Sequence, residues 1–299
     1  MTKTPKLVRV TIIIGFIFFV CLNGHAQDTL VLRNGKRIGI LRLAMANDHL
    51  KVKNSLTKEF EAYPFDSVFG YTKGSKERAY FLKKNPGMDY SGYFFLKRIA
   101  VGRLTLFENT GNDQSLYLEK DGRFEKVFGV TESKAKKAKR LQVFQSFVSD
   151  DEESTAYLNA PELKYKWDEI ITVVEHYNER NFVERLPQSS DVLGRVYLYR
   201  TQFQKTKQGI KIKLYGKDHD LYIEDFIMLN LPVEYASQLH LRDSEVRSTH
   251  EMSGELNEQF FEVLLDPGTN TFRFDKKKGT ELQYEFFKIR DQVNKKINN

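Results

Sequence analysis

The chain has 299 residues, with 47 Lys and Arg against 40 Asp and Glu, and therefore a formal net charge of +7. This excess is mild for the length and does not support nucleic-acid binding. Aromatic residues make up 13% of the sequence, which favours a packed globule over a disordered chain. The length allows one large or two medium domains.

The first 26 residues have the three-part pattern of a secretory signal peptide. A positively charged head is followed by an apolar run at Val10–Leu22, and Gly24-His25-Ala26 supplies small residues before a cleavage site. The run is shorter than the about 20 residues of a membrane-spanning helix, so a retained anchor is the less favoured interpretation. A lipid anchor on Cys21 is a third alternative, disfavoured because the bulky Val20 precedes it.

Cleavage after Ala26 changes the composition of the mature chain. The removed segment holds three basic residues, no acidic residue and the single Cys, so the net charge falls from +7 to +4. Without cysteine the mature protein has no disulfide and no thiol nucleophile, and it depends on its core for stability. We expect export to the periplasm, to the outer membrane or to the cell exterior.

The opening mature segment is typical of β structure. Asn34-Gly35 lies between alternating apolar runs, and both residues tolerate positive φ, so the sequence predicts a hairpin. Leu30 and Leu32 alternate on one side, and the return strand and the next run continue this period-two pattern. The further positions expected to continue this pattern are Ile38, Ile40, Leu50, Val52, Val68 and Phe69, with Arg42 on the same side of the return strand as Ile38 and Ile40.

This segment resembles a small Sm-like β module, a short curled barrel, of exported proteins of certain Gram-negative bacteria. The residues that match its outline are Asp28, Leu30, Leu32, Asn34, Gly35, Ile38 and Gly39. Further strands are expected around the turns "TGND" and "KDG", and Phe95–Phe107 resembles the continuation found in the same exported proteins. The resemblance implies an architecture and no activity. We therefore expect a β module with a strand-rich continuation over residues 27–130.

Residues 131–187 have helical periodicity. Ala138, Leu141, Phe144 and Val148 form one expected apolar stripe. The second stripe consists of Leu163, Trp167, Ile170, Ile171, Val174 and Tyr177. The sequence thus predicts two amphipathic helices, joined by an acidic connection in which Pro161 is suited to the first turn of a helix.

After a polar linker at Arg185–Gly194 the sequence again alternates in period two. Ile210, Ile212 and Leu214 oppose Lys211 and Lys213, which indicates one buried and one wet face. About seven strands at turn-punctuated intervals predict an antiparallel β-sandwich over residues 192–299. The last of these expected strands is Glu281–Ile289.

The stretches "RVYLYR" and "LLDPGTNTFRF" resemble small sandwich domains of bacterial envelope proteins, which have a Pro-Gly turn late in the domain. Pro267-Gly268 matches this turn, whereas Asn270 stands where those domains have a histidine or a similar residue.

Two segments contain residues that could bind a metal ion, but in both the spacing favours a purely structural role. His250 begins like a zinc-protease helix, but the second ligand position is Gly254. The cluster Asp218, His219, Asp220, Glu224 and Asp225 lacks calcium-loop spacing and is typical of a solvated turn between two strands.

Two charged runs and the single tryptophan are further candidates. Asp150–Glu153 is expected to cap no helix and to face water or the basic run before it. That run, Lys134–Arg140, is either a solvated helix face or a contact for an anionic partner such as lipopolysaccharide, phospholipid or glycan. Trp167 is expected in the core, with carbohydrate stacking as the alternative.

The fold class expected from the sequence is α+β, mostly β, with a small N-terminal barrel-like unit, a helical middle and a C-terminal sandwich. We assign no catalytic, cofactor-binding or metal-binding residue, because no serine-hydrolase elbow, phosphate loop or dinucleotide fingerprint occurs. The function expected is an exported, non-catalytic binding or scaffold protein of the bacterial envelope, with an envelope protein or glycan as partner and no membrane span after signal removal. The alternative is a carboxylate-based hydrolase of an envelope polymer, which would require a cleft with two or more buried acidic groups.

Overall fold

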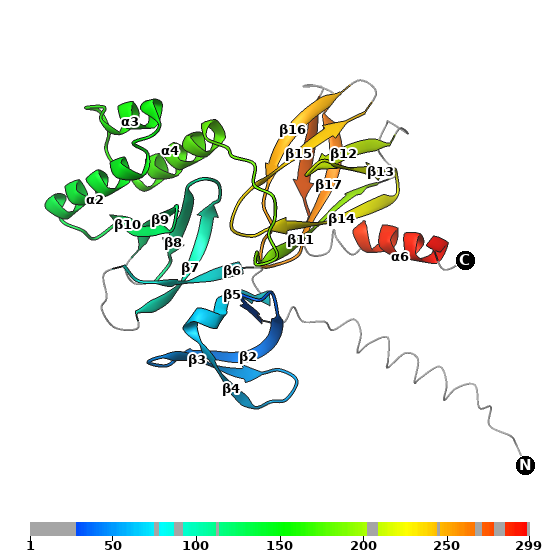
Figure 1. The fold of residues 1–299 in the computed structure, drawn as a ribbon, viewed down its shortest axis with the longest axis horizontal. Coiled ribbons are helices and arrows are strands. Elements are labelled where there is room, and N and C mark those ends of the chain that lie inside the picture. The colour runs from blue at the N-terminus through cyan, green and yellow to red at the C-terminus, as the bar shows by residue number, and fades with distance from the viewer. Residues whose placement is uncertain are drawn as a thin grey trace, which may run out of the picture.

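The protein is described from a computed structural model that covers residues 28–74, 78–86, 92–111, 114–201, 209–243, 246–266, 271–277 and 285–297. The expected signal peptide, the Pro267-Gly268 turn and Asn270 lie outside these residues. The fold is mostly β, as the sequence predicts, and has four helices among the described residues (Figure 1).

The N-terminal half is built on one antiparallel ten-stranded sheet with the order β10-β9-β8-β7-β6-β5-β1-β2-β3-β4. The expected N-terminal module and its continuation therefore share one sheet. Its strands are β1 (Thr29–Leu32), β2 (Arg37–Met45), β3 (His49–Asn54), β4 (Phe60–Pro64), β5 (Val68–Lys73), β6 (Arg78–Lys84), β7 (Tyr93–Ala100), β8 (Thr105–Asn109), β9 (Ser115–Lys120) and β10 (Arg123–Gly129).

Strands β1 to β5 form the curled end of this sheet, at the bottom of Figure 1. The expected hairpin joins β1 to β2, with Gly35 at φ +80°, and the short helix η1 (Phe65–Ser67) precedes β5. The curl encloses a core cluster to which the predicted apolar series contributes Leu30, Leu32, Ile38, Ile40, Leu50, Val52 and Val68. Two expectations are corrected: β4 and β5 are not paired, so the barrel is not closed, and Arg42 is exposed beyond a β-bulge in β2.

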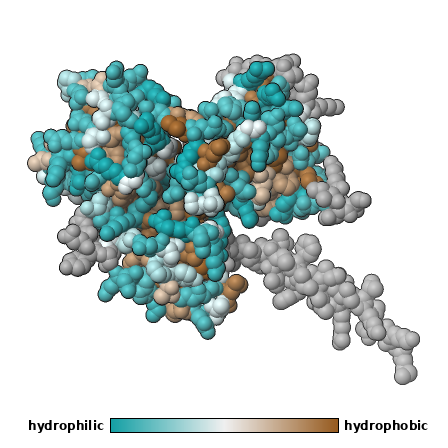
Figure 2. Space-filling view, viewed as in Figure 1, coloured by the Kyte–Doolittle hydropathy of each residue, from teal (hydrophilic) through white to brown (hydrophobic). Residues whose placement is uncertain are grey.

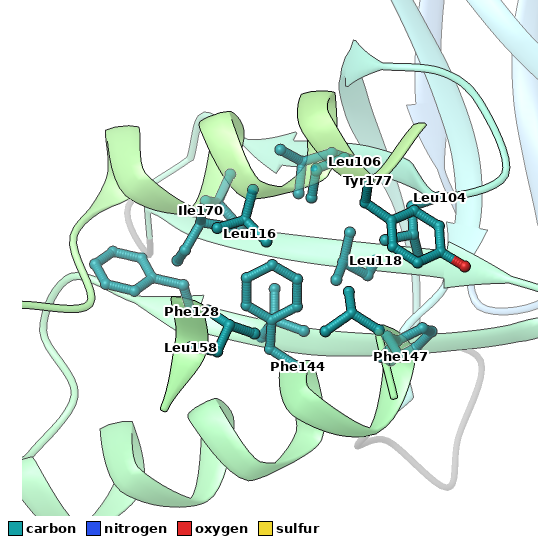
Figure 3. Close-up of a cluster of buried hydrophobic side chains, with 14 of the residues drawn as sticks. Leu104, Leu106, Leu116, Leu118, Phe128, Phe144, Phe147, Leu158, Ile170 and Tyr177 are labelled. Carbon is teal, nitrogen blue, oxygen red and sulfur yellow. The ribbon is translucent and has the colours of Figure 1, made fainter. Parts of the chain in front are cut away.

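Three helices cover one face of strands β8 to β10 (Figures 1 and 3): α2 (Lys134–Phe147), α3 (Glu152–Leu158) and α4 (Trp167–Arg180). Phe144 of α2 and Ile170 and Tyr177 of α4 point into a layer of leucines from the sheet. The helical segment thus shares its core with the strands before it. No helix among the described residues is long and apolar enough to cross a membrane.

Three details of this segment differ from expectation. The acidic connection contains the additional helix α3, and Pro161 lies six residues before α4 begins. Ala138 is exposed, and Phe147 is buried instead. Because the side chain of alanine is small, its burial adds little to a core, and the position of Ala138 in the helical repeat is a weak indication of burial.

The C-terminal unit consists of two four-stranded sheets, with the orders β14-β11-β17-β18 and β13-β12-β15-β16, which pack around a shared core. Its strands are β11 (Leu193–Arg200), β12 (Ile210–Leu214), β13 (Lys217–Leu221), β14 (Asp225–Pro232), β15 (Ser237–Arg242), β16 (Arg247–Met252), β17 (Gln259–Asp266) and β18 (Thr271–Lys276). The predicted faces of β12 are confirmed: Ile210, Ile212 and Leu214 are buried, and Lys211 and Lys213 are exposed.

Two features of this sandwich correct the sequence-based expectation. Strands β11 and β17 pair in parallel, so the unit is not purely antiparallel. The expected strand Glu281–Ile289 is wrong over its last four residues, because helix α6 (Phe286–Ile297) begins there. Phe286 and Ile289 lie one helical turn apart and pack on Tyr199 of β11 together with several partly buried aromatic residues, which explains the helix.

Candidate functional site: an interdomain cleft

A cleft of about 810 Å³ lies between the ten-stranded sheet and the sandwich. One side is formed by residues of β1, β2, β5, β6 and β7, and the other by β11, β18 and the segment 255–260 that leads into β17. Figure 2 shows the mostly hydrophilic lobes that these units form. Such interfaces between units are frequent ligand-binding places, and the volume is in the usual range for small-molecule sites.

The floor of the cleft is a row of small residues across four strands. Gly39, Thr29, Thr72 and Ala79 are direct neighbours in the register of β2, β1, β5 and β6, and all four line the cleft. The hydroxyl of Thr72 has no hydrogen-bond partner among the described residues. Small side chains keep this part of the sheet accessible to a ligand.

The neighbouring row on the same face is covered by Leu256. This side chain is fully buried and belongs to a cluster with Val31, Phe81 and other residues of the sheet. Gly70 makes room for it, since a Cβ on Gly70 would lie 2.8 Å from Leu256 Cδ1. Leu256 therefore packs the sandwich against the sheet, next to the row of small residues that forms the floor of the cleft.

Arg98 makes the second contact that joins the two units. It donates hydrogen bonds to the carbonyl oxygens of Val233 and Gly254, the latter at 3.0 Å, and it is 3.1 Å from a carboxylate oxygen of Glu255. Its guanidinium also lies 4.9 Å from the ring centroid of Phe81. With all these contacts satisfied and a side chain that is 4% exposed, Arg98 holds the two units together.

The cleft carries an excess of positive charge. Arg37 donates to the carbonyl oxygen of Leu256, and burial, followed by the like charge of Arg195, lowers the pKa of Arg37. Arg78 is exposed and has no ion-pair partner among the residues that the structure describes, and neither has Arg37. The basic residues in the described lining of the cleft are Arg37, Arg78, Lys97, Arg98, Arg195, Lys276 and Lys277.

The two acidic residues in the lining, Glu255 and Glu258, are already engaged. Glu255 pairs with Arg98, and Glu258 is 3.2 Å from Arg195 and raises the pKa of that arginine by accepting its hydrogen bond. Their side chains are 31% and 46% exposed. The cleft thus exists where the hydrolase hypothesis requires one, but its described carboxylates are neither buried nor free.

Gln259 adds a polar group to this wall. It is 7% exposed, and its Oε1 has no hydrogen-bond partner within the described part of the chain. A buried acceptor without a partner costs free energy, so a ligand N–H or O–H group that reached it would be stabilised.

The segments that suggested metal chemistry do not form such a site. His250 lies on strand β16 rather than on a helix and packs edge-on against Phe274, and burial lowers its pKa. Asp218, His219 and Asp220 lie within β13 rather than in a turn, which corrects that expectation, and Glu224 and Asp225 follow beyond it. No group of three or more potential metal ligands occurs among the described residues.

The acidic run has a structural role that differs from expectation. Asp151 caps α3 by accepting a hydrogen bond from the Ser154 amide, and Arg180 binds both of its carboxylate oxygens. Asp150 pairs with Arg103 at 2.9 Å and Lys120 at 2.8 Å. The expectation that this run caps nothing and faces water is therefore wrong for these two residues.

The basic run and the tryptophan lie on the helical layer. Arg140 pairs with Glu132, Lys137 lies over the ring of Phe128, and Lys134 is exposed. Trp167 packs edge-on against Phe128 in the helical core, which confirms its predicted place.

Sequence reasoning missed the residues of the cleft. Arg37 of β2, Arg78 of β6 and Leu256, in the segment between β16 and β17, lie far apart along the chain and meet only through long-range packing. The one local signal was Ser253-Gly254 followed by a lone leucine between two strands, which marks a close approach of backbones.

The fold and the cleft define a two-unit, mostly β protein with a cationic interdomain groove. Comparison with protein-family models, with curated proteins and with solved structures found no significant match.

Proposed function

We propose that this chain is an exported, non-catalytic binding protein of a bacterial envelope and that the interdomain cleft is its ligand site. The observation that carries the proposal is the charge of the cleft, whose described lining holds seven basic side chains and two acidic ones. Lys97, Arg98, Arg195 and Lys277 are paired with carboxylates, whereas Arg37 and Arg78 have no ion-pair partner among the described residues. The chemistry that fits is a small ligand with a carboxylate or phosphate group. Arginine recognises both of these groups through paired hydrogen bonds.

The arrangement of the cleft supports a binding role more than hydrolysis. A glycoside hydrolase needs two carboxyl groups about 5 Å or about 6.5–9.5 Å apart, one of which has a raised pKa. In this cleft Glu255 and Glu258 are instead paired with Arg98 and Arg195. The floor residues Thr29, Gly39 and Ala79 are partly exposed and small, so they leave room for a bound molecule beside the arginines.

The test is isothermal titration calorimetry of residues 27–299 with citrate, inorganic phosphate and an acidic tetrapeptide. We expect at least one of these anions to bind, and binding to weaken by about tenfold or more in R37Q/R78Q, since each lost charge-assisted hydrogen bond contributes about 1.5 kcal/mol or more.

The matched control is R33Q/R42Q, which removes the same charge from exposed arginines of the same unit. Equal affinity of the two variants, or no heat with any of the three anions, would contradict the proposal. Release of reducing ends from an envelope polysaccharide by the wild type would favour the hydrolase instead.

A further inference from the structure

The sandwich carries a second basic surface that shares no residue with the cleft. It is a shallow hollow of about 480 Å³ on the outer face of the sheet β13-β12-β15-β16. The polar residues that matter for its chemistry are Lys211, Lys213, His240, Arg242, Arg247 and Thr249. The opposite face of the same strands is buried in the sandwich core, so these side chains are the wet face of a fixed scaffold.

The strand register places like charges directly opposite one another. Lys211 of β12 is paired with Arg242 of β15, and Arg242 is paired with Arg247 of β16. Neighbouring strands lie about 4.8 Å apart, so three cations form one row across three strands. Like charges in directly opposite positions of a sheet destabilise it.

Strand β13 offsets part of this repulsion. The register places Asp220 opposite Lys211 and Asp218 opposite Lys213, and Asp218 is also 3.8 Å from Arg242, at the far limit of an ion pair. Lys211, Lys213 and Arg247 have no ion-pair partner among the described residues. The face therefore keeps an excess of positive charge that the two aspartates of β13 compensate only in part.

We propose that this face binds an anionic polysaccharide, whose charged groups bridge the row of cations and whose hydroxyls contact Thr249 and His240. A chain of regularly spaced anions suits a row of regularly spaced cations better than a single small anion does. A membrane surface fits less well, because interfacial contacts need exposed large apolar residues. Leu241, the one apolar residue among the described residues that line the hollow, is 1% exposed.

The experiment measures binding of a heparin octasaccharide and of an oligogalacturonate to residues 27–299 at fixed salt. We expect K211Q/R242Q/R247Q to bind at least one of these saccharides about tenfold more weakly than the wild type, from three exposed ion pairs of ordinary strength. The matched control, R42Q/K51Q/K53Q, removes three cations from a sheet face of the N-terminal unit and should bind like the wild type. The cleft variant R37Q/R78Q should also bind normally, which separates this site from the proposed cleft site.

A second readout is the thermal stability of the unliganded protein. Because the variant relieves repulsion, K211Q/R242Q/R247Q should melt at the same temperature as the wild type or slightly above it. The proposal is overturned if neither saccharide binds or if the control variant loses binding equally. It is also overturned if phosphatidylglycerol vesicles or duplex DNA bind more tightly than both saccharides at the same salt concentration.

Discussion

Single residues decide how the two β units meet. Gly70 leaves the space that Leu256 fills, and Arg98 donates to two main-chain carbonyls of the sandwich. None of these contacts follows from a local pattern, since each joins residues more than a hundred positions apart. Their burial makes them sensitive to small changes in size.

Replacing Gly70 with alanine should destabilise the protein by about 1–3 kcal/mol, the usual cost of overpacking a filled core. The new Cβ would lie 2.3 Å from the carbonyl oxygen of Tyr80 and 2.8 Å from Leu256 Cδ1, so the backbone and the side chain would have to move. Urea unfolding followed by tryptophan fluorescence measures this change. An unfolding midpoint equal to that of the wild type would show that the backbone and Leu256 can shift at this contact without loss of stability.

Asp151 provides a pH-dependent contribution to stability. The hydrogen bond from Arg180 is the main reason why the pKa of this buried carboxyl lies below its ordinary value of 3.8, and the Ser154 amide adds to the effect. A lowered folded-state pKa means that the contribution is complete above about pH 4 and is lost as the pH falls through the folded-state value.

We therefore expect Asp151→Ala to reduce the unfolding free energy at pH 7 by about 1–2 kcal/mol, the range found for lost helix caps. The difference from the wild type should shrink steadily as the pH is lowered below 4. Urea titrations at several pH values check this, with Glu152→Ala, an exposed neighbour, as the control. A difference that stays constant down to pH 2 would contradict the role of the charge.

At the scale of the elements, local patterns gave correct answers where one face of a strand is buried and the other is wet. The β1–β2 hairpin and the alternation in β12 belong to this group. They did not show that the second face of β1 is buried as well: Leu30 packs into the curled core as predicted, but Val31 packs toward the sandwich. They also failed at α6, whose aromatic residues fit a strand as well as a helix until the packing partner is known.

Two phenylalanines of β18 face the core of the sandwich: Phe272 is 2% exposed, and Phe274 is partly buried and packs on the same core. Phe272→Ala should cost about 3–5 kcal/mol, the usual price of an aromatic cavity. Lys211→Ala, on the wet face of the sandwich, should cost almost nothing. Thermal or urea unfolding of both variants tests the pair, and similar melting of the two would show that Phe272 contributes little to the core.

At the scale of the whole molecule, the class of fold could be predicted from the sequence because it depends on local periodicity. The cleft could not, because its floor is made by the register of β2, β1, β5 and β6 and its wall by a segment from near the other end of the chain. The parallel pairing of β11 with β17 is likewise a long-range event, about sixty residues apart. Periodicity says which face of a strand is apolar, but it does not say which strand will lie beside it.

The division of the chain predicts that residues 192–299 fold on their own. A unit of about 100 residues is large enough for its own core, and the described sandwich has one. An expressed 192–299 fragment should give a β-type far-UV circular dichroism spectrum with a helical component from α6 and a cooperative melt. Val192, Val233 and Leu256 would become exposed in the fragment, so we expect lower solubility than that of the full chain. An unfolded or mainly helical fragment would refute the division.

The linker and the interface together lead to a prediction about the nicked protein. Leu186 is 64% exposed, whereas Val192 is buried and the Asp191 carboxylate accepts hydrogen bonds from Tyr235 and from the Gln188 amide. Limited proteolysis with subtilisin should therefore cut near Leu186 before it cuts either β region, because nicking concentrates in exposed polar segments. The two pieces should remain associated after the cut, since Leu256 and Arg98 hold the units together independently of the linker.

Size-exclusion chromatography of the nicked protein checks this, with co-elution of both pieces as the expected result. Leu256→Asp should release them, because it places an unpaired carboxylate in the fully buried cluster around Val31 and Phe81. Leu193→Asp, at an exposed position of the same unit, is the control that should leave the pieces together. If the wild-type pieces separate as soon as the linker is cut, the chain connection, rather than the packed interface, keeps the cleft formed. In that case the cleft would open whenever the contacts between the two units loosen.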